Sequence, residues 1–309
     1  MEKERVILGE NCCYSSDCNE TGLNNNIIVC GGSGSGKTMS ISEPRLLETK
    51  TSSLISTVTK RRIVTKYMPL FKERGYNVLD LNFVNPIEST CSYDPLKYVA
   101  SYSDITFLAK SIVKADPQKD RSSADPYWDE AAISLLSAEI AYILMTNDKA
   151  TFADVLELHD SLTIDEGGST IRTSLDDQFD YMASEYPTCF AVSCAGCVFG
   201  TLNTTIDTIF SPELREMMVT KPQVDFELMA TEKTILFVTT SAVNPALHCF
   251  VNMFYAQAFK QLFEYAESSQ NGVLPVPVHV LCDDFATGGR VLNFAEYISI
   301  FREKRISVT

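Results

Sequence analysis

The 309-residue sequence has no run of 18 or more apolar residues, so it lacks a segment that could span a membrane as a helix. Its longest mainly apolar stretch, residues 131–145, contains Glu139 and several small residues, which indicates a buried core helix. The first ten residues, MEKERVILGE, lack the apolar core and cleavage site of a secretory signal peptide. These absences predict a cytoplasmic location.

Positive charge is also scarce. The chain has 26 Lys and Arg against 40 Asp and Glu, a net charge of −14. A protein that grips duplex DNA over its surface usually presents a basic footprint. Any nucleic-acid contact would therefore be local, for example inside a channel. The alternative is that the negative net charge indicates only a soluble acidic surface. The apolar content of 45% is typical of a folded protein with one large α/β domain or two domains.

The ten cysteines and three histidines lack the paired spacing of a structural zinc site. Two groups of cysteines are close in sequence, Cys12, Cys13 and Cys18 in one and Cys194 and Cys197 in the other. Neither has a second pair nearby, so free thiols are favoured over zinc. Three further cysteines lie in apolar patterns and are expected to be buried: Cys30, Cys249 and Cys282.

Apolar patterns predict a chain in which strands and helices alternate at both ends. The expected strands are residues 5–8, 27–30, 53–58, 76–83, 233–240 and 275–282, with the opening of one more strand after residue 305. Residues 11–26 are expected to form a loop or hairpin. The expected helices are 38–48, 66–74, 105–113, 128–145, 152–159, 245–267 and 291–304, with amphipathic stretches around 170–186 and 190–209. This alternation predicts a mostly parallel sheet with covering helices, interrupted by a helical insertion.

A glycine-rich turn matches G-x-x-x-x-G-K-[ST] in full, between an apolar run and a predicted helix. In such a loop, backbone N–H groups and the helix N-terminus cradle phosphates. The lysine reaches the β- and γ-phosphates, and the hydroxyl after it ligates Mg²⁺. The alternative, a turn that binds nothing, is disfavoured by this context. The residues of the cradle are Gly31, Gly32, Ser33, Gly34, Ser35, Gly36, Lys37 and Thr38.

A second acidic element completes such a site. Asp283 follows the apolar run VHVLC and is expected to hold Mg²⁺ from the end of a strand. Asp284 either polarises the attacking water or serves as a helix N-cap or loop carboxylate. Trp128, the only tryptophan, is expected to be a packing anchor.

Five stretches in order resemble the coupling proteins of type IV secretion and conjugation, the TraG-like branch of hexameric P-loop motors. They are NNNIIVCGGSGSGKT with EPRLLE; GYNVLDLNFVNP with SYDPLKYV; DPYWDEAA; KTILFVTT; and LCDDFATGGRVLNFAEYISIFREKRIS. They span nearly the whole chain, and the last is the most specific.

The resemblance implies an α/β P-loop NTPase of the RecA-like type, with helices on both faces of a mostly parallel sheet and an inserted all-α domain. The nucleotide-binding domain would comprise residues 1–103 and 219–309, with the insertion at 104–218. It implies ATP and Mg²⁺ as cofactors, a homo-hexamer, single-stranded DNA and a relaxase as cargo, and secretion-channel components as partners. Family members are anchored at the inner face of the cell membrane by segments that are absent here. Arg302 would reach the nucleotide of the neighbouring subunit; the alternative is a solvated cation at a helix end.

Two departures from the family pattern leave a second function open. The family usually has Asp-Pro-Lys-Gly-Glu where this chain has Val-Thr-Lys-Arg-Arg at 58–62, and it prefers glycine at Arg305. The family also continues past residue 309, which suggests a fragment of a longer protein or a reduced relative. The leading interpretation is an ATPase motor domain, and the alternative is a nucleotide-binding docking module that does not hydrolyse ATP. A small-molecule kinase is disfavoured by the long separation of Lys37 and Asp283.

Overall fold

The computed structural model describes residues 3–114, 126–164, 171–172, 195–241, 244–283 and 291–309. The described residues form a central five-stranded parallel sheet with the strand order β4-β7-β3-β8-β9. The strands are β3 (Ser53–Val58), β4 (Asn77–Asn82), β7 (Thr234–Thr239), β8 (Val278–Cys282) and β9 (Ile306–Val308). Every one of them lies in a segment that the sequence predicts as a strand.

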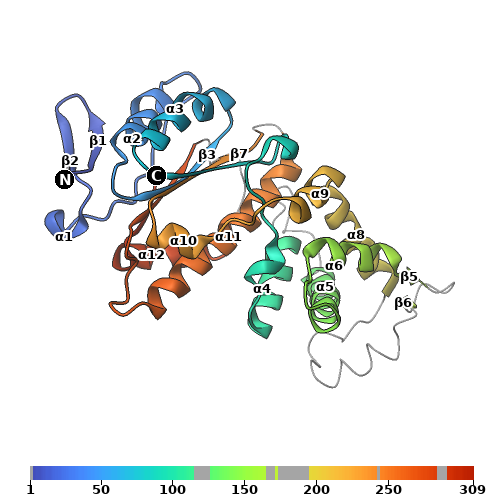
Figure 1. The fold of residues 1–309 in the computed structure, drawn as a ribbon. Helices are drawn as coiled ribbons and strands as arrows, with labels where there is room; N and C mark the ends of the chain where they lie inside the picture. Colours follow the sequence, from blue (N-terminus) through green and yellow to red (C-terminus); the bar gives the residue numbers. More distant parts are fainter. Residues whose placement is uncertain (1–2, 115–125, 165–170, 173–194, 242–243, 284–290) are drawn as a thin grey trace.

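Both faces of the sheet are buried, because alternate residues of each strand enter different apolar clusters. Leu54 and Phe237 pack with the helix α3 (Arg61–Glu73) on one face. Ile55 and Leu236 pack on the other face, in the cluster that contains α11 (Pro245–Ser268) and α12 (Phe294–Lys304). Figure 1 shows α2 (Glu43–Glu48) and α3 on one side of the sheet and α10 (Phe226–Thr231), α11 and α12 on the other. The predicted α/β fold with helices on both faces is confirmed.

The N-terminal residues form a hairpin beside the sheet. Strands β1 (Arg5–Gly9) and β2 (Cys12–Ser15) pair antiparallel, and α1 (Cys18–Thr21) follows. The hairpin contacts the helical segment after the glycine-rich turn, which comprises η1 (Thr38–Ser42) and α2 (Glu43–Glu48).

The expected buried strand at residues 27–30 is wrong. The segment has no strand structure, Ile28 is 88% exposed, and Cys30 is exposed rather than buried. Its link to the sheet is through β9, where the Ile27 N–H donates to the Val308 carbonyl at 2.8 Å. The segment therefore lies beside β9, the edge strand of the sheet, where Ile28 is not covered.

Between the two groups of sheet strands, the described residues are almost entirely helical. They form α4 (Tyr102–Val113), α5 (Pro126–Thr146), α6 (Phe152–Ser161), α8 (Ala195–Ile209) and α9 (Pro212–Thr220), with a short pair of β5 (Thr163–Ile164) and β6 (Ile171–Arg172). The short helices η2 (Pro86–Glu88) and η3 (Pro95–Tyr98) lead into this part. Figure 1 shows these α-helices gathered beyond one end of α11. Most of the stretch expected around 170–186 lies outside the described residues.

The helical part shares its core with the sheet. One continuous apolar cluster runs from the face of the sheet that α11 covers to α4, α5, α6 and α8. Trp128 packs against this cluster, as expected. A buried pair ties α5 to α6, since Glu139 and the Nδ1 of His159 lie 2.9 Å apart. Burial raises the pKa of the Glu139 carboxyl above its ordinary value.

Candidate nucleotide site

The glycine-rich turn has the backbone that its glycines permit. Gly34 and Gly36 have φ of +76° and +86°, a region that residues with a Cβ rarely adopt. A Cβ at Gly31 would lie 2.5 Å from the Ser35 Oγ, so that hydroxyl would have to rotate away. The next helix begins directly, with the Ser40 N–H donating to the Gly36 carbonyl at 2.9 Å. The turn therefore directs a helix N-terminus toward the loop, the arrangement that favours an anion.

Lys37 lies over its own loop. Its ammonium donates to the carbonyl oxygens of Gly31 at 2.7 Å and Gly32 at 3.1 Å, and the side chain is partly exposed. Gly32, Ser33 and the neighbouring loop residues are exposed. The lysine can therefore exchange carbonyl oxygens for phosphate oxygens without crossing a packed core.

Asp283 and Thr38 lie together although 245 positions separate them. The Thr38 Oγ1 donates to the Asp283 carboxylate, with distances of 3.1 and 3.3 Å to its two oxygens. The Ser42 hydroxyl lies 3.3 Å from one of these oxygens. A carboxylate with two hydroxyl groups is a set of hard oxygen donors that suits Mg²⁺. The residues present therefore fit a metal at this end of β8.

Ser42 is a contact that the sequence interpretation missed. A signal existed, because residues four apart lie on the same face of a helix and Ser42 is one turn after Thr38. Asp284, the other predicted acid, lies outside the described residues.

Arg302 does not face its own loop. It lies in the last turn of α12 and lines a groove with Pro277 and Val278, at the amino end of β8. Thr38 and Asp283 meet at the carboxyl end of the same strand. Arg302 is thus at the opposite end of the sheet from the phosphate loop of its own chain.

Arg61 lies in the segment 58–62 that replaces the family's Asp-Pro-Lys-Gly-Glu, at the position of its glycine. Its guanidinium forms two parallel hydrogen bonds to Asp80 on β4, at 2.7 and 2.8 Å, and a third to the Thr239 hydroxyl on β7 at 2.9 Å. The bond to Asp80 raises the pKa of Arg61. The side chain therefore ties the start of α3 to two strands and is directed away from the loop.

Other predicted features have mixed outcomes. Cys249 is buried, and Cys282 is partly buried, with burial raising the pKa of its thiol to about 12. Cys194 lies outside the described residues. Across the part of the chain that is described, no group of three or more His, Cys, Asp or Glu side chains is arranged to hold a metal. No helix among the described residues is long and apolar enough to cross a membrane.

Comparisons with known proteins agree with this geometry. The fold is similar to the bacterial conjugative coupling protein TrwBdeltaN70 in complex with sulphate, with a TM-score of 0.55 and 13% identity, over 100% of this chain and 71% of that one. It is also similar to the plasmid coupling protein TrwB in complex with ADP and Mg²⁺, with a TM-score of 0.52, 10% identity and coverage of 100% and 72%. The complex of TrwB with the ATP analogue ADPNP gives a TM-score of 0.52, 12% identity and the same coverage. A comparison with curated protein sequences finds no match.

The family profile of type IV secretory system conjugative DNA transfer proteins matches residues 2–309, nearly the whole chain. Together with the phosphate loop, the acid at the end of β8 and the parallel sheet, this match shows that the chain belongs to the family of type IV secretory system conjugative DNA transfer proteins.

Proposed function

We propose that this chain is the nucleotide-binding motor domain of a coupling protein. In this proposal it binds ATP and Mg²⁺, and hydrolysis drives the transfer of single-stranded DNA with a relaxase. The observation that carries the proposal is the contact of Thr38 with Asp283, which unites the phosphate loop and the strand-end acid at one edge of the sheet. The similar protein TrwB, solved with ADP and Mg²⁺, supports the choice of cofactors.

Each residue of the loop then has a role. The N–H groups of residues 31–38 and the helix N-terminus bind phosphate oxygens. Lys37 leaves the carbonyl oxygens of Gly31 and Gly32 for the β- and γ-phosphates. Thr38 and Asp283 are the residues that would hold the metal through their side-chain oxygens. Mg²⁺, when bound, neutralises the charge that develops on the phosphates.

Two further residues complete the proposed catalysis. Asp284 follows Asp283 and would orient the attacking water. Arg302 lies at the far end of the sheet from its own loop, so it could act only on the nucleotide of a neighbouring subunit. That role agrees with a homo-hexameric ring, in which DNA contacts are confined to an inner channel of an otherwise acidic protein.

The proposed setting is the cytoplasmic face of a secretion channel. Channel components and the relaxase would be the protein partners. The helical segment 104–218 would be an inserted domain that contacts the cargo and shares its apolar core with the sheet, while residues 1–103 and 219–309 would form the nucleotide-binding domain. All strands of the five-stranded sheet come from these two outer segments, which supports the division.

A docking module that binds ATP without hydrolysing it is the second candidate. The observation that favours it is the loss of the family's two acids, since Val58 and Arg62 stand where the family carries Asp and Glu.

Turnover separates the two candidates. Phosphate release from Mg²⁺-ATP is measured with and without single-stranded DNA, for the parent and Asp283→Asn. The motor predicts release that DNA stimulates and that Asp283→Asn removes. Binding of ATP without release under any of these conditions contradicts the motor and supports the docking module.

A further inference from the structure

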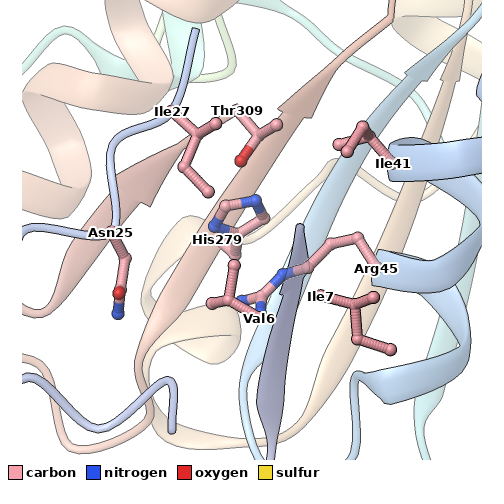
Figure 2. A pocket seen from close by; sticks show the side chains of 8 residues that line it. All are labelled: Val6, Ile7, Asn25, Ile27, Ile41, Arg45, His279 and Thr309. Atoms are coloured by element: carbon pink, nitrogen blue, oxygen red, sulfur yellow. The ribbon is translucent and has the colours of Figure 1, made fainter. Parts of the chain in front are cut away.

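The strand β8 presents its side chains alternately to the two faces of the sheet. His279 points toward Arg45 of α2, as Figure 2 shows, and Asp283 meets the helical segment η1 on this same side. Cys282, one position before Asp283, packs instead against the apolar cluster that contains α11. β8 ends at Cys282, whose N–H donates to the Thr309 carbonyl at 2.8 Å. The direction in which the chain leaves the sheet toward Asp283 therefore depends on how Cys282 is held.

Three polar side chains from three elements meet at the end of β8. On β3, Thr57 is the register partner of Cys282. The hydroxyl of Tyr255, from α11, is hydrogen-bonded to the hydroxyl of Thr57, and the Cys282 thiol lies in hydrogen-bonding contact with both. Tyr255 is 1% exposed and Thr57 is 6% exposed. These three side chains, the Tyr255 cluster, tie α11 to the ends of β3 and β8.

The hydroxyl groups of the Tyr255 cluster do more than fill space. Burying a hydroxyl lowers stability unless it is hydrogen-bonded, and phenylalanine and valine would occupy nearly the same volume without a polar atom. Packing alone therefore does not require the Tyr255 hydroxyl. What the hydroxyl adds is a bond that is strong only over a narrow range of distance and angle. That bond fixes α11 at one position relative to the end of β8, whereas apolar contacts are not directional.

We propose that Tyr255 is a positioning residue for Asp283 and acts through Thr57 and Cys282. The inference rests on the proposed function, because it concerns the carboxylate that this function assigns to Mg²⁺. Cys282 and Asp283 are neighbours in the chain, so a displacement of Cys282 also displaces the Asp283 carboxylate relative to Thr38, which lies 3.1 Å away. Mg²⁺ demands near-ideal octahedral geometry and tolerates little displacement of a ligand.

Hydrogen exchange without nucleotide tests the Tyr255 cluster itself. Tyr93→Phe is the matched control, since it removes an equally buried tyrosine hydroxyl that bonds to Gln257 on the same helix α11. We expect Tyr255→Phe to speed the exchange of the Cys282 amide about fivefold, the change that the loss of one ordinary hydrogen bond gives, and Tyr93→Phe to leave it at the rate of the parent. An unchanged rate in Tyr255→Phe, or an equal increase in both variants, overturns the proposal.

Metal affinity gives the second measurement. Mn²⁺, as a probe for Mg²⁺, is titrated into each protein with ADP present, and free Mn²⁺ is followed by electron paramagnetic resonance. We expect binding to be about tenfold weaker in Tyr255→Phe, at the lower end of the cost of removing a residue that supports a metal ligand, and unchanged in Tyr93→Phe. Thr57→Val should reproduce the loss, and Thr57→Ser, which keeps the hydroxyl, should retain the affinity of the parent.

The outcomes separate this inference from the proposed function. Equal Mn²⁺ affinity in the parent, Tyr255→Phe and Thr57→Val overturns the positioning role and leaves the nucleotide site in place. A parent that binds no Mn²⁺ with ADP contradicts the proposed function, and the exchange rate of the Cys282 amide then still decides whether Tyr255 holds the end of β8. If Tyr255→Phe does not fold, the comparison of Thr57→Val with Thr57→Ser decides both measurements.

Discussion

Removal of Arg61 should destabilise the fold far more than removal of its neighbour Arg62. Asp80 is almost fully buried, with a side chain 4% exposed, and among the described residues Arg61 is the only side chain bonded to its two carboxylate oxygens. Arg61→Ala therefore leaves a buried carboxylate without a partner. Breaking a buried pair in this way costs about 3–5 kcal/mol.

The expected magnitude is lower because the pair is not fully enclosed. The Arg61 side chain is 38% exposed, so water screens part of the interaction. We expect Arg61→Ala to lower the free energy of unfolding by about 2–3 kcal/mol. Arg62→Ala, an exposed matched control, should change it by less than about 0.5 kcal/mol.

Urea unfolding followed by circular dichroism measures these changes, with Asp80→Asn added to complete a double-mutant cycle. The double variant should be more stable than the sum of the single changes predicts, because Asp80→Asn removes the charge that Arg61→Ala strands. If Arg61→Ala is as mild as Arg62→Ala, or if the two changes are additive, the pair does not stabilise the fold as argued. ATP affinity should be the same in Arg61→Ala as in the parent, since Arg61 is directed away from the phosphate loop.

Two further predictions concern backbone conformation and pH. Arg305 caps α12 with a φ of +61°, a backbone conformation that is strained for a residue with a Cβ. Arg305→Gly should be about 1 kcal/mol more stable than Arg305→Ala, because both variants lose the bonds to Leu274 and Pro275 and only alanine keeps the strain. Equal urea midpoints for the two variants would contradict this. Burial raises the pKa of Asp94 from 3.8 to about 6, so its ionisation disfavours the native state. The parent should therefore lose about 3 kcal/mol relative to Asp94→Asn as pH rises from about 3 to 7, and a pH-independent difference in unfolding free energy would refute the shift.

The sheet could be predicted from the sequence because its strands are short apolar runs that both faces bury. The strand predicted at 53–58 agrees with β3 to the residue. The same rule failed at 27–30, since four apolar residues cannot show how far a segment is covered by its neighbours. In the structure this segment lies beside the edge strand β9, and Ile28 is exposed.

Contacts between distant residues explain the other differences. The sequence predicts a helix from residue 66, whereas α3 begins at Arg61. Two cations in a first turn oppose the helix dipole, so the local pattern disfavours this start. The bond of Arg61 to Asp80 offsets that cost, and no local pattern reveals it.

The parts of the candidate site that belong to a motif could be predicted from the sequence. Thr38 and Asp283 were both named from such motifs, and the structure brings them into contact. The family's preference for glycine at position 305 also has a physical basis in the left-handed conformation that Arg305 adopts. The spacing of Ser42 from Thr38 could have indicated its place on the same helix face, but its contact with Asp283 depends on tertiary packing.

The most direct test of the central claim is thermal unfolding of the parent and Lys37→Ala, with and without Mg²⁺-ATP, with the exposed Lys72→Ala as a control. Binding to the native state alone adds about 2.7 kcal/mol of stability at a ligand concentration 100 times Kd. The account predicts a rise in melting temperature in the parent and in Lys72→Ala that vanishes in Lys37→Ala. No rise in the parent, or an equal rise in all three proteins, would contradict a phosphate site at this loop.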